Sequence, residues 1–415
     1  MLFRSSMQWL GLDWDEGPFF QMRRLARYKE VAEQLIASGN AYYCWASKEE
    51  LENLRTQQRA RNEKPRYDGR WRPERAKAAG LAPPADRPPV IRFRTPEEGE
   101  AAWHDLVKGP ISFPNAELDD LVLLRADGVP TYNFGVVVDD LDMAITHVIR
   151  GDDHVNNTPR QLHIFRALAE EKKIPAFAHL PMILGADGER LSKRHGAVSV
   201  TQYRDEGFLP EALLNTLARL GWSHGDDEVF SLKQMVEWFD LGHVSHSPAK
   251  FDPEKALWMN QQYIKNADDE RLAELVLPEL KRFGISETGN PKLNLVVSLL
   301  KDRANTLRHL AESAHLFYVY EEPAPAKLAE LVNGRTRPAL RMLAAKLAET
   351  PWERKALGAA IGAVLKSTGL KMPELAMPAR LLVTGRTQTP PLDSVLELLG
   401  RETALARLAR HLQGD

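Results

Sequence analysis

Residues 144–168 read AITHVIRGDDHVNNTPRQLHIFRAL and predict a strand, a short loop and a helix in succession. The branched residues at the start have the length of a buried strand. Thr158 is a good N-cap, Pro159 suits the first helical position and Gln161 completes a capping box. This order is typical of doubly wound α/β sheets, which bind ligands at the carboxyl ends of their strands. We therefore expect Arg150 at the rim of a sheet, where its guanidinium can hold a carboxylate through two parallel hydrogen bonds.

A second informative stretch, residues 185–199, reads GADGERLSKRHGAVS. Its glycines permit backbone conformations that other residues avoid. Arg190, Lys193 and Arg194 supply clustered donors for an anion such as a phosphate. A solvated charged loop explains the composition as well, so this stretch indicates a phosphate clamp only together with other segments.

The third stretch, residues 127–140, reads DGVPTYNFGVVVDD. A turn precedes Tyr132, and an apolar run then ends in two carboxylates. Tyr132 taken alone would be assigned to the hydrophobic core.

In combination and in this order, the three stretches resemble the glutamyl-tRNA synthetase branch of the class I aminoacyl-tRNA synthetases. The run Arg190, Leu191, Ser192, Lys193, Arg194 resembles the KMSKS signature of that class. The resemblance implies that Lys193 stabilises the triphosphate of ATP while the adenylate forms. It further implies that Tyr132 and Arg150 hold glutamate, and that Asp153 and His154 lie against ATP.

Further segments that look like the family extend the resemblance over nearly the whole chain. It implies a multidomain α/β plus all-α fold: a class I Rossmann-like nucleotide fold with an α+β insertion, then helical stem-contact and anticodon-binding domains. The expected boundaries are 1–28 and 131–184 for the catalytic domain, 29–130 for the insertion that grips the tRNA acceptor end, 185–265 for the signature loop and stem contacts, and 266–415 for the anticodon domain. The additional segments are Met7–Pro18, Lys64–Arg70, Phe113–Leu124 and Ser245–Trp258.

One departure from the family concerns the beginning of the chain. Family members open with a strand, a glycine-containing turn and a helix that carries the HIGH signature, whose histidines and helix N-terminus meet the phosphates of ATP. No such segment precedes Met1 in this sequence. We therefore expect a polypeptide that starts at Met1 to show no glutamate-dependent pyrophosphate exchange while retaining salt-sensitive tRNA binding.

The composition is that of an ordinary globular protein of about three domains. Apolar residues make up 43% and charged residues 27% of the 415 residues, and the formal net charge is −2. A nearly neutral chain argues against indiscriminate nucleic-acid binding but is compatible with local basic surfaces for tRNA. No long apolar run or signal peptide is expected, and the single cysteine, Cys44, fits the cytoplasm. The family suggests a monomer.

The insertion carries its own local signals. Residues 28–36 have helical spacing, residues 41–45 and 90–94 predict strands, and Ser47 with Glu50 predicts a capping box. Residues 72–89 are rich in proline and alanine and predict a loop. Some relatives bind zinc here through closely spaced cysteines, but Ala46 and Trp71 stand at the other candidate positions, so we expect no zinc. Basic candidates for tRNA phosphates, each equally explained as a solvated residue, are Arg55, Arg59, Arg61, Lys64, Arg66 and Arg70.

The C-terminal half is predicted to be helical. One long helical pattern covers residues 203–222, and Ser231 with Gln234 predicts a further capped helix. From residue 266 onward the pattern is helical, with expected breaks at Pro278, Pro323, Gly334, Pro351, Gly369 and Pro390. Single-stranded anticodon bases need edge contacts and stacking; the candidate residues are Arg335, Arg337, Arg341, Arg380 and Arg386.

Three functions remain open from the sequence. The first is a glutamate–tRNA ligase that uses ATP, with Mg²⁺, to activate glutamate and transfers it to the 3′ end of tRNA(Glu). The second is a non-catalytic tRNA-binding descendant or fragment of such a ligase. The third is a nucleotidyltransferase that acts on a small carboxylate without an RNA partner, against which the insertion and the helical tail argue.

Overall fold

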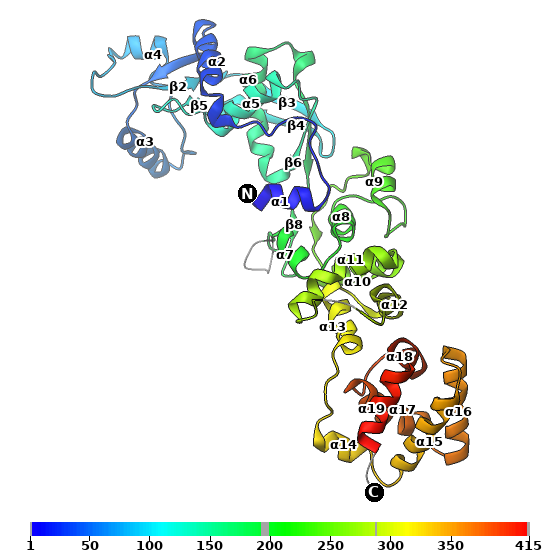
Figure 1. Ribbon diagram of the computed structural model, residues 1–415. Helices are drawn as coiled ribbons and strands as arrows, with labels where there is room; N and C mark the ends of the chain where they lie inside the picture. Colours follow the sequence, from blue (N-terminus) through cyan, green and yellow to red (C-terminus); the bar gives the residue numbers. More distant parts are fainter. Residues whose placement is uncertain (1, 192–198, 287–288, 413–415) are drawn as a thin grey trace.

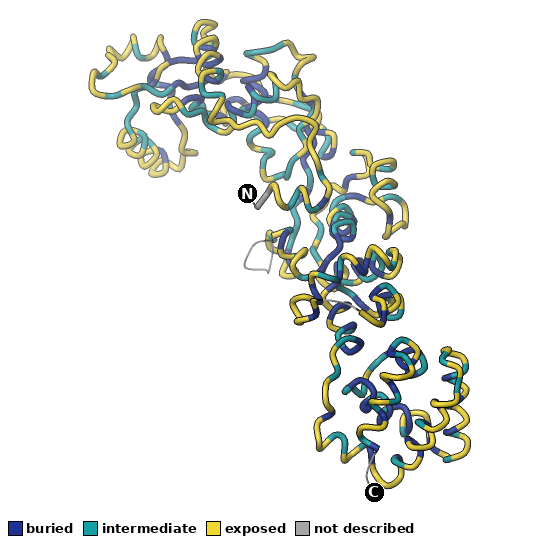
Figure 2. The backbone as a smooth tube through the Cα atoms, viewed as in Figure 1, coloured by how far each residue is buried: buried dark blue, intermediate teal, exposed yellow. Residues whose placement is uncertain are grey.

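The computed structural model describes residues 2–191, 199–286 and 289–412. The molecule is elongated, with the insertion at one end and the C-terminal helices at the other (Figure 1). Buried segments run through the interior of each part, while most helices expose one side (Figure 2). Within the described residues, no helix is both long and apolar enough to span a membrane.

A four-stranded mixed sheet forms the centre of the N-terminal half, in the order β4-β3-β7-β6. Strands β6 and β7 are parallel neighbours, β3 pairs parallel with β7, and β3 and β4 form an antiparallel hairpin. This sheet joins strands on both sides of residue 130, where the sequence analysis placed the end of the insertion. The strands are β3 (Glu100–Asp105), β4 (Gly109–Pro114), β6 (His147–Gly151) and β7 (Ala176–Leu180).

The predicted strand, loop and helix are present with changed boundaries. The strand β6 begins at His147, because Ala144 has a positive φ of 51° and its N–H bonds to the carbonyl of Leu141 at the end of the preceding helix. It is an edge strand whose Ile149 is exposed, so the expected buried strand is wrong for the described structure. The elements that follow it are the 3₁₀ helix η3 (Asp152–Asn157) and the helix α6 (Thr158–Leu168).

The predicted capping box of α6 is also wrong. Thr158 is the first helical residue, Asn157 stands at the N-cap, and no side chain caps this end. The Thr158 hydroxyl instead contacts Arg150 and His179, while Gln161 donates to Asn133. Tertiary hydrogen bonds have therefore replaced the local ones.

Helices α2, α5 and α6 share one hydrophobic core with strands of the four-stranded sheet and of a second sheet, which lies in the insertion. Phe134 and Phe165 are fully buried in this core. The helix α5 starts directly at Tyr132, after the turn that was predicted to precede this residue. The bounds are α1 (Leu2–Trp9), α2 (Leu25–Ala37) and α5 (Tyr132–Asp142).

The insertion contains a second, antiparallel sheet in the order β1-β2-β5. The predicted capping box of Ser47 and Glu50 is confirmed at the start of α3. The loop predicted over residues 72–89 is partly wrong, because Pro73 at the first turn begins a short helix. The bounds are β1 (Ala41–Cys44), α3 (Lys48–Ala60), α4 (Pro73–Ala78), β2 (Val90–Phe93) and β5 (Val122–Leu124).

Residues 181–266 connect the central sheet to the C-terminal helices. The long helix expected over residues 203–222 is divided, because Gly207 adopts a φ of +90° and the next helix starts at Pro210. The capping box of Ser231 and Gln234 is confirmed. The bounds are β8 (Ile183–Leu184), α7 (Val200–Asp205), α8 (Pro210–Arg219), α9 (Leu232–Trp238), β9 (Ala249–Lys250) and α10 (Pro253–Asn266).

The described residues beyond 266 are helical, as predicted, and share one extensive apolar core with α8 and α10. The break expected at Pro278 is wrong: this proline lies inside α11, where the buried Leu272, Val276 and Leu280 hold the helix by packing. The bounds are α11 (Asp269–Arg282), α12 (Leu293–Leu300), α13 (Leu307–Tyr318), α14 (Pro325–Leu331), α15 (Thr336–Glu349), α16 (Arg354–Thr368), α17 (Met372–Thr384), α18 (Leu392–Leu399) and α19 (Arg401–Leu412).

Candidate active site

Three segments that are distant in sequence meet around the end of β6: the start of α5, residues 150–154 and the stretch around Arg190. The Tyr132 ring at the start of α5 lies 5.8 Å from the His154 ring in η3, centroid to centroid. Arg190, after β8, donates to Asp153 at 2.9 Å. Arg150 lies in β6, where burial lowers the pKa of the guanidinium and its interaction with Tyr132 acts to raise it. The described candidate residues are therefore brought together.

Arg150 forms hydrogen bonds to residues of the central sheet and of α6. Its Nε lies 3.2 Å from Nε2 of His179, and its Nη2 donates to the Thr158 hydroxyl at 2.8 Å. The guanidinium also lies over the Phe177 ring, 5.6 Å from the centroid. Burial lowers the pKa of Arg150, and the neighbouring Tyr132 opposes this shift. A fixed, partly desolvated cation of this kind suits a carboxylate ligand.

Asp140 is a half-buried carboxyl group on α5 that interacts electrostatically with this cation. Burial, and then repulsion by Asp139, raise the pKa of Asp140 to about 6, while Arg150 acts in the opposite direction. Protonation of Asp140 would remove a negative charge near Arg150. The sequence analysis did not identify this group as a site residue.

The loop between β3 and β4 contacts the residues that follow β6. Lys108 pairs with Asp152 at 3.0 Å, immediately before the candidate Asp153. At the end of β3, immediately before this loop, Asp105 contacts the buried His179. Sequence reasoning missed Asp105, Lys108 and His179; the one available signal was a histidine inside the apolar run of β7.

The base of the signature loop is ordered by backbone pairing. Gly185 N–H donates to the Glu189 carbonyl, and Leu191 N–H donates to that of Ile183. Strand β8 pairs parallel with β9, so residues 249–250 lie beside the loop base. Ser192, Lys193 and Arg194 lie outside the described residues, and their roles stay predictions.

In the insertion, Cys44 belongs to a buried apolar cluster with Tyr42, Tyr67 and Trp71. Its sulfur lies 3.4 Å from the Tyr67 hydroxyl and 3.3 Å from Nε of Arg92. Within the described part of the chain, no group of three or more His, Cys, Asp or Glu side chains is placed to hold a metal. The expectation that this site binds no zinc stays a prediction.

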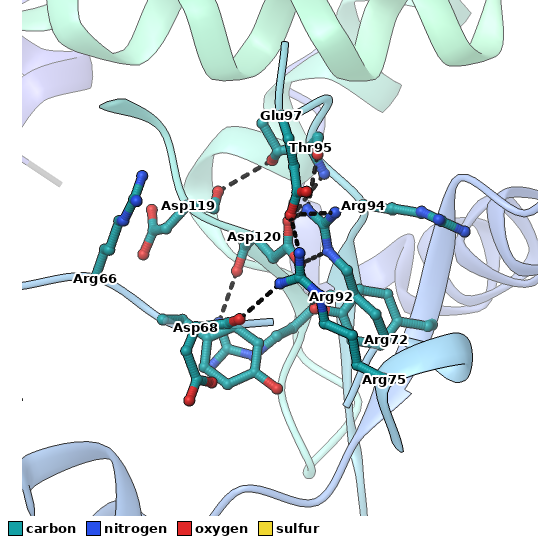
Figure 3. A network of polar contacts seen from close by, with 12 residues as sticks. Arg66, Asp68, Arg72, Arg75, Arg92, Arg94, Thr95, Glu97, Asp119 and Asp120 are labelled. Atoms are coloured by element: carbon teal, nitrogen blue, oxygen red, sulfur yellow. Dashed lines mark hydrogen bonds and ion pairs between the residues drawn. The ribbon is translucent and has the colours of Figure 1, made fainter. Parts of the chain in front are cut away.

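A polar network in the insertion is centred on Asp120 (Figure 3). Arg72 donates to both carboxylate oxygens of Asp120, at 2.7 and 2.6 Å, and to Glu97 at 2.9 Å. The Tyr42 hydroxyl and the N–H of Thr95 also donate to this carboxylate. The Arg72 and Asp120 side chains are only 8% and 3% exposed. Each of these buried charges is therefore neutralised by the other.

Asp120→Ala is expected to destabilise the insertion by about 3–5 kcal/mol, because it leaves the buried Arg72 guanidinium without its main partner. Equilibrium urea unfolding, combined with hydrogen exchange of β1 and β2, measures the loss. Glu117→Ala is the matched control, since its ion pair with Lys64 is exposed and contributes at most about 1 kcal/mol. Equal losses in the two variants would contradict the role assigned to Asp120.

A cavity of about 700 Å³ opens beside this network. Lys64 and Arg66, two of the candidate tRNA residues, line it together with Asp68, Glu97 and Asp119. Arg70 is engaged with Asp68, while Arg55 and Arg59 pair with Glu52 on α3. The described candidates are thus spread over the helix α3 and the cavity rim.

The candidate anticodon residues lie in or next to α15 and α17. Arg335 is 69% exposed and pairs with Glu374, and Arg386 pairs with Glu321. Arg337 donates to the carbonyl of His411, and Arg341 to that of Leu412, both in the last helix. Arg380 lies in α17, with its Nε buried. Arg335 is the candidate best placed to reach a ligand.

Comparison with known proteins gives concordant results for both halves. Residues 3–258 match the family model of the class I tRNA synthetase catalytic domain (E and Q), and residues 271–412 match that of an anticodon-binding domain. The chain is 59% identical to a glutamate–tRNA ligase of Nitrosospira multiformis, over 99% of this chain and 87% of the relative. It is 60% identical to the corresponding ligase of Thiobacillus denitrificans, over 97% of this chain and 85% of the relative.

A solved structure is also similar along almost the entire chain. The crystal structure of a glutamate tRNA ligase from Elizabethkingia meningosepticum, in complex with its amino acid, superimposes with a TM-score of 0.84 at 29% identity. The match covers 99% of this chain and 88% of that chain. The α/β and helical parts therefore share both sequence and fold with these relatives.

Proposed function

The chain belongs to the glutamate–tRNA ligase family of the class I tRNA synthetases, and we propose that Tyr132 and Arg150 hold its glutamate substrate. The protein is a ligase that activates glutamate with ATP and transfers it to tRNA. The match of residues 271–412 to an anticodon-binding domain argues against a nucleotidyltransferase without an RNA partner.

The convergence of Tyr132, Arg150 and His154 is the observation that supports this site. Arg150 is anchored through Nε and Nη2, so its orientation is set before a substrate arrives. A preorganised guanidinium pays little entropy on binding a carboxylate and recognises its planar shape. Tyr132 is 52% exposed, so we propose that its hydroxyl contacts the same glutamate substrate as Arg150.

On the nucleotide side, we propose that Asp153, His154 and Lys193 contact ATP. Arg190 pairs with Asp153 and so connects the signature loop to the 3₁₀ helix η3 after β6. Adenylate formation then depends on positioning and on stabilising the phosphate charge, without a covalent protein nucleophile. Mg²⁺ would accompany ATP and neutralise part of that charge.

We further propose that tRNA(Glu) contacts the insertion around Lys64 and Arg66 and the C-terminal helices around Arg335, Arg337, Arg380 and Arg386. The domain boundaries given in the sequence analysis stay a proposal, and the central sheet includes β3 and β4 from within the range proposed for the insertion. A monomeric, cytoplasmic enzyme is the form we propose.

Tyr132→Phe tests the glutamate side of this proposal. Removing one hydroxyl that contacts the substrate is expected to raise the KM for glutamate about three- to tenfold, with little change in the KM for ATP. The measurement is steady-state aminoacylation by the ligase that contains this chain. Tyr43→Phe, an exposed tyrosine of the insertion, is the matched control; the proposal fails if both variants keep the parental KM for glutamate.

A further inference from the structure

The Arg150 side chain contacts a completely buried histidine, His179. Arg150 and His179 are register partners on the parallel strands β6 and β7. The side chains of His179 and Asp105 are both 0% exposed. A buried pair of this kind, in contact with a substrate-binding group, needs a physical explanation.

The hydrogen bonds of Asp105 assign each of its two oxygens a separate task. Its Oδ1 accepts the backbone N–H groups of Val107, Lys108 and His179, at 3.1, 2.9 and 3.1 Å. Its Oδ2 lies 2.5 Å from Nδ1 of His179 and accepts a longer hydrogen bond from Nε1 of Trp103, at 3.4 Å. Burial would raise the pKa of Asp105, but these hydrogen bonds lower it overall. The carboxylate is therefore charged and can only accept, which places a proton on Nδ1 of His179.

The opposite ring nitrogen of His179 then acts as an acceptor. Burial lowers the pKa of His179 despite the opposing effect of Asp105, so the imidazole is neutral. With Nδ1 protonated, Nε2 carries a lone pair, and it lies 3.2 Å from Nε of Arg150. Thr158 closes the arrangement, since its hydroxyl lies 3.1 Å from Nε2 and accepts from Nη2 of Arg150 at 2.8 Å.

We propose that Asp105 and His179 are positioning residues that orient the Arg150 guanidinium toward the substrate carboxylate. This inference rests on the proposed role of Arg150 in glutamate binding. Asp105 fixes the tautomer of His179, and His179 in turn fixes the rotation of the guanidinium through Nε. Neither residue touches the substrate, so their effect reaches glutamate only through Arg150.

Asp105→Asn reverses this chain of hydrogen bonds with almost no change in volume. The asparagine oxygen can keep accepting the three backbone N–H groups, while its amide nitrogen donates to Nδ1 of His179. The proton then moves to Nε2, which faces the N–H of Arg150 donor to donor. We expect the KM for glutamate to rise about tenfold or more, with the KM for ATP and kcat changed much less.

Two further readouts distinguish positioning from a general structural role. NMR of ¹⁵N-histidine-labelled protein is expected to show His179 protonated at Nδ1 in the parent and at Nε2 in Asp105→Asn. His179→Gln, whose amide oxygen can accept from Arg150, is expected to raise the KM for glutamate less than His179→Leu does. The control is His163→Leu, another buried histidine, bonded to Asn115 at 2.8 Å, which is expected to leave the KM for glutamate unchanged.

The outcomes separate this inference from the proposed function. A switched tautomer with an unchanged KM for glutamate overturns the positioning role, as do equal effects of His179→Gln and His179→Leu. If Asp105→Asn does not fold, the two His179 variants decide the question. An unchanged KM in Arg150→Lys would overturn the role of Arg150 itself, and with it both proposals.

Discussion

Replacing Lys193 with alanine is expected to slow glutamyl-tRNA formation about a hundredfold or more while leaving tRNA affinity nearly intact. A positive charge placed where negative charge develops on the phosphates lowers the barrier, and loss of one such preorganised contact typically has an effect of this size. The loop base, with Arg190 held against Asp153, lies next to the proposed nucleotide position. Single-turnover transfer and tRNA binding, measured separately on the ligase that contains this chain, test the expectation.

Lys172→Ala is the matched control for this variant. Its side chain is 74% exposed and pairs with Glu170, before β7 begins and therefore at the other end of the strand from the site. We expect normal rates from it. A turnover number of Lys193→Ala equal to that of the control would exclude a role for Lys193 in the transition state.

Arg150→Lys is expected to raise the KM for glutamate about ten- to a hundredfold and to affect the KM for ATP much less. Lysine keeps the charge but loses the planar fork that grips a carboxylate bidentately. It also cannot reproduce both anchoring bonds, from Nε to His179 and from Nη2 to Thr158. Hydrogen bonds to charged groups contribute about 1.5–3 kcal/mol each, which corresponds to this range.

Steady-state aminoacylation at varied glutamate and at varied ATP provides the measurement. Arg166→Lys is a suitable control, since this residue of α6 pairs with Glu171 near the end of that helix. A parallel rise in both KM values for Arg150→Lys would indicate a structural arginine instead of a substrate ligand.

The residues of the site that the sequence predicted are those in contiguous motifs. Arg150 was predicted from the local strand, loop and helix pattern, whereas Asp153 and His154, which follow it in η3, were assigned only through the family resemblance. Arg190 was predicted from the cluster of basic residues in its own stretch, and Tyr132 only because the order of three motifs resembled a family. That the five described residues meet in space depends on the sheet order β4-β3-β7-β6, which no single motif encodes.

Asp105 and His179 were missed for a physical reason. They lie 74 positions apart, and their contact exists only because β3 and β7 are paired. Thr158 shows the converse error, because its local sequence predicts a helix cap while its hydroxyl is used by Arg150. Local propensity predicted elements well where nothing competed, as at Ser47 and Ser231, and less well where tertiary contacts offered other partners.

Boundary errors in the helices have similar causes. The helix α4 was predicted as loop because proline and alanine dominate residues 72–89, although proline is favoured in the first helical turn. Pro278 was predicted to break a helix, but α11 continues through it because its apolar face packs in the large C-terminal core. At Pro73 the position within the first helical turn explains the outcome, and at Pro278 the packing of the apolar face of α11 explains it.

A crystal structure of the protein with bound glutamate tests the central claim most directly. We predict that a substrate carboxylate accepts hydrogen bonds from the Arg150 guanidinium, with the Tyr132 hydroxyl on the same ligand and Nε of Arg150 still bonded to His179. Glutamate bound elsewhere, with Arg150 engaged only with His179 and Thr158, would contradict the account.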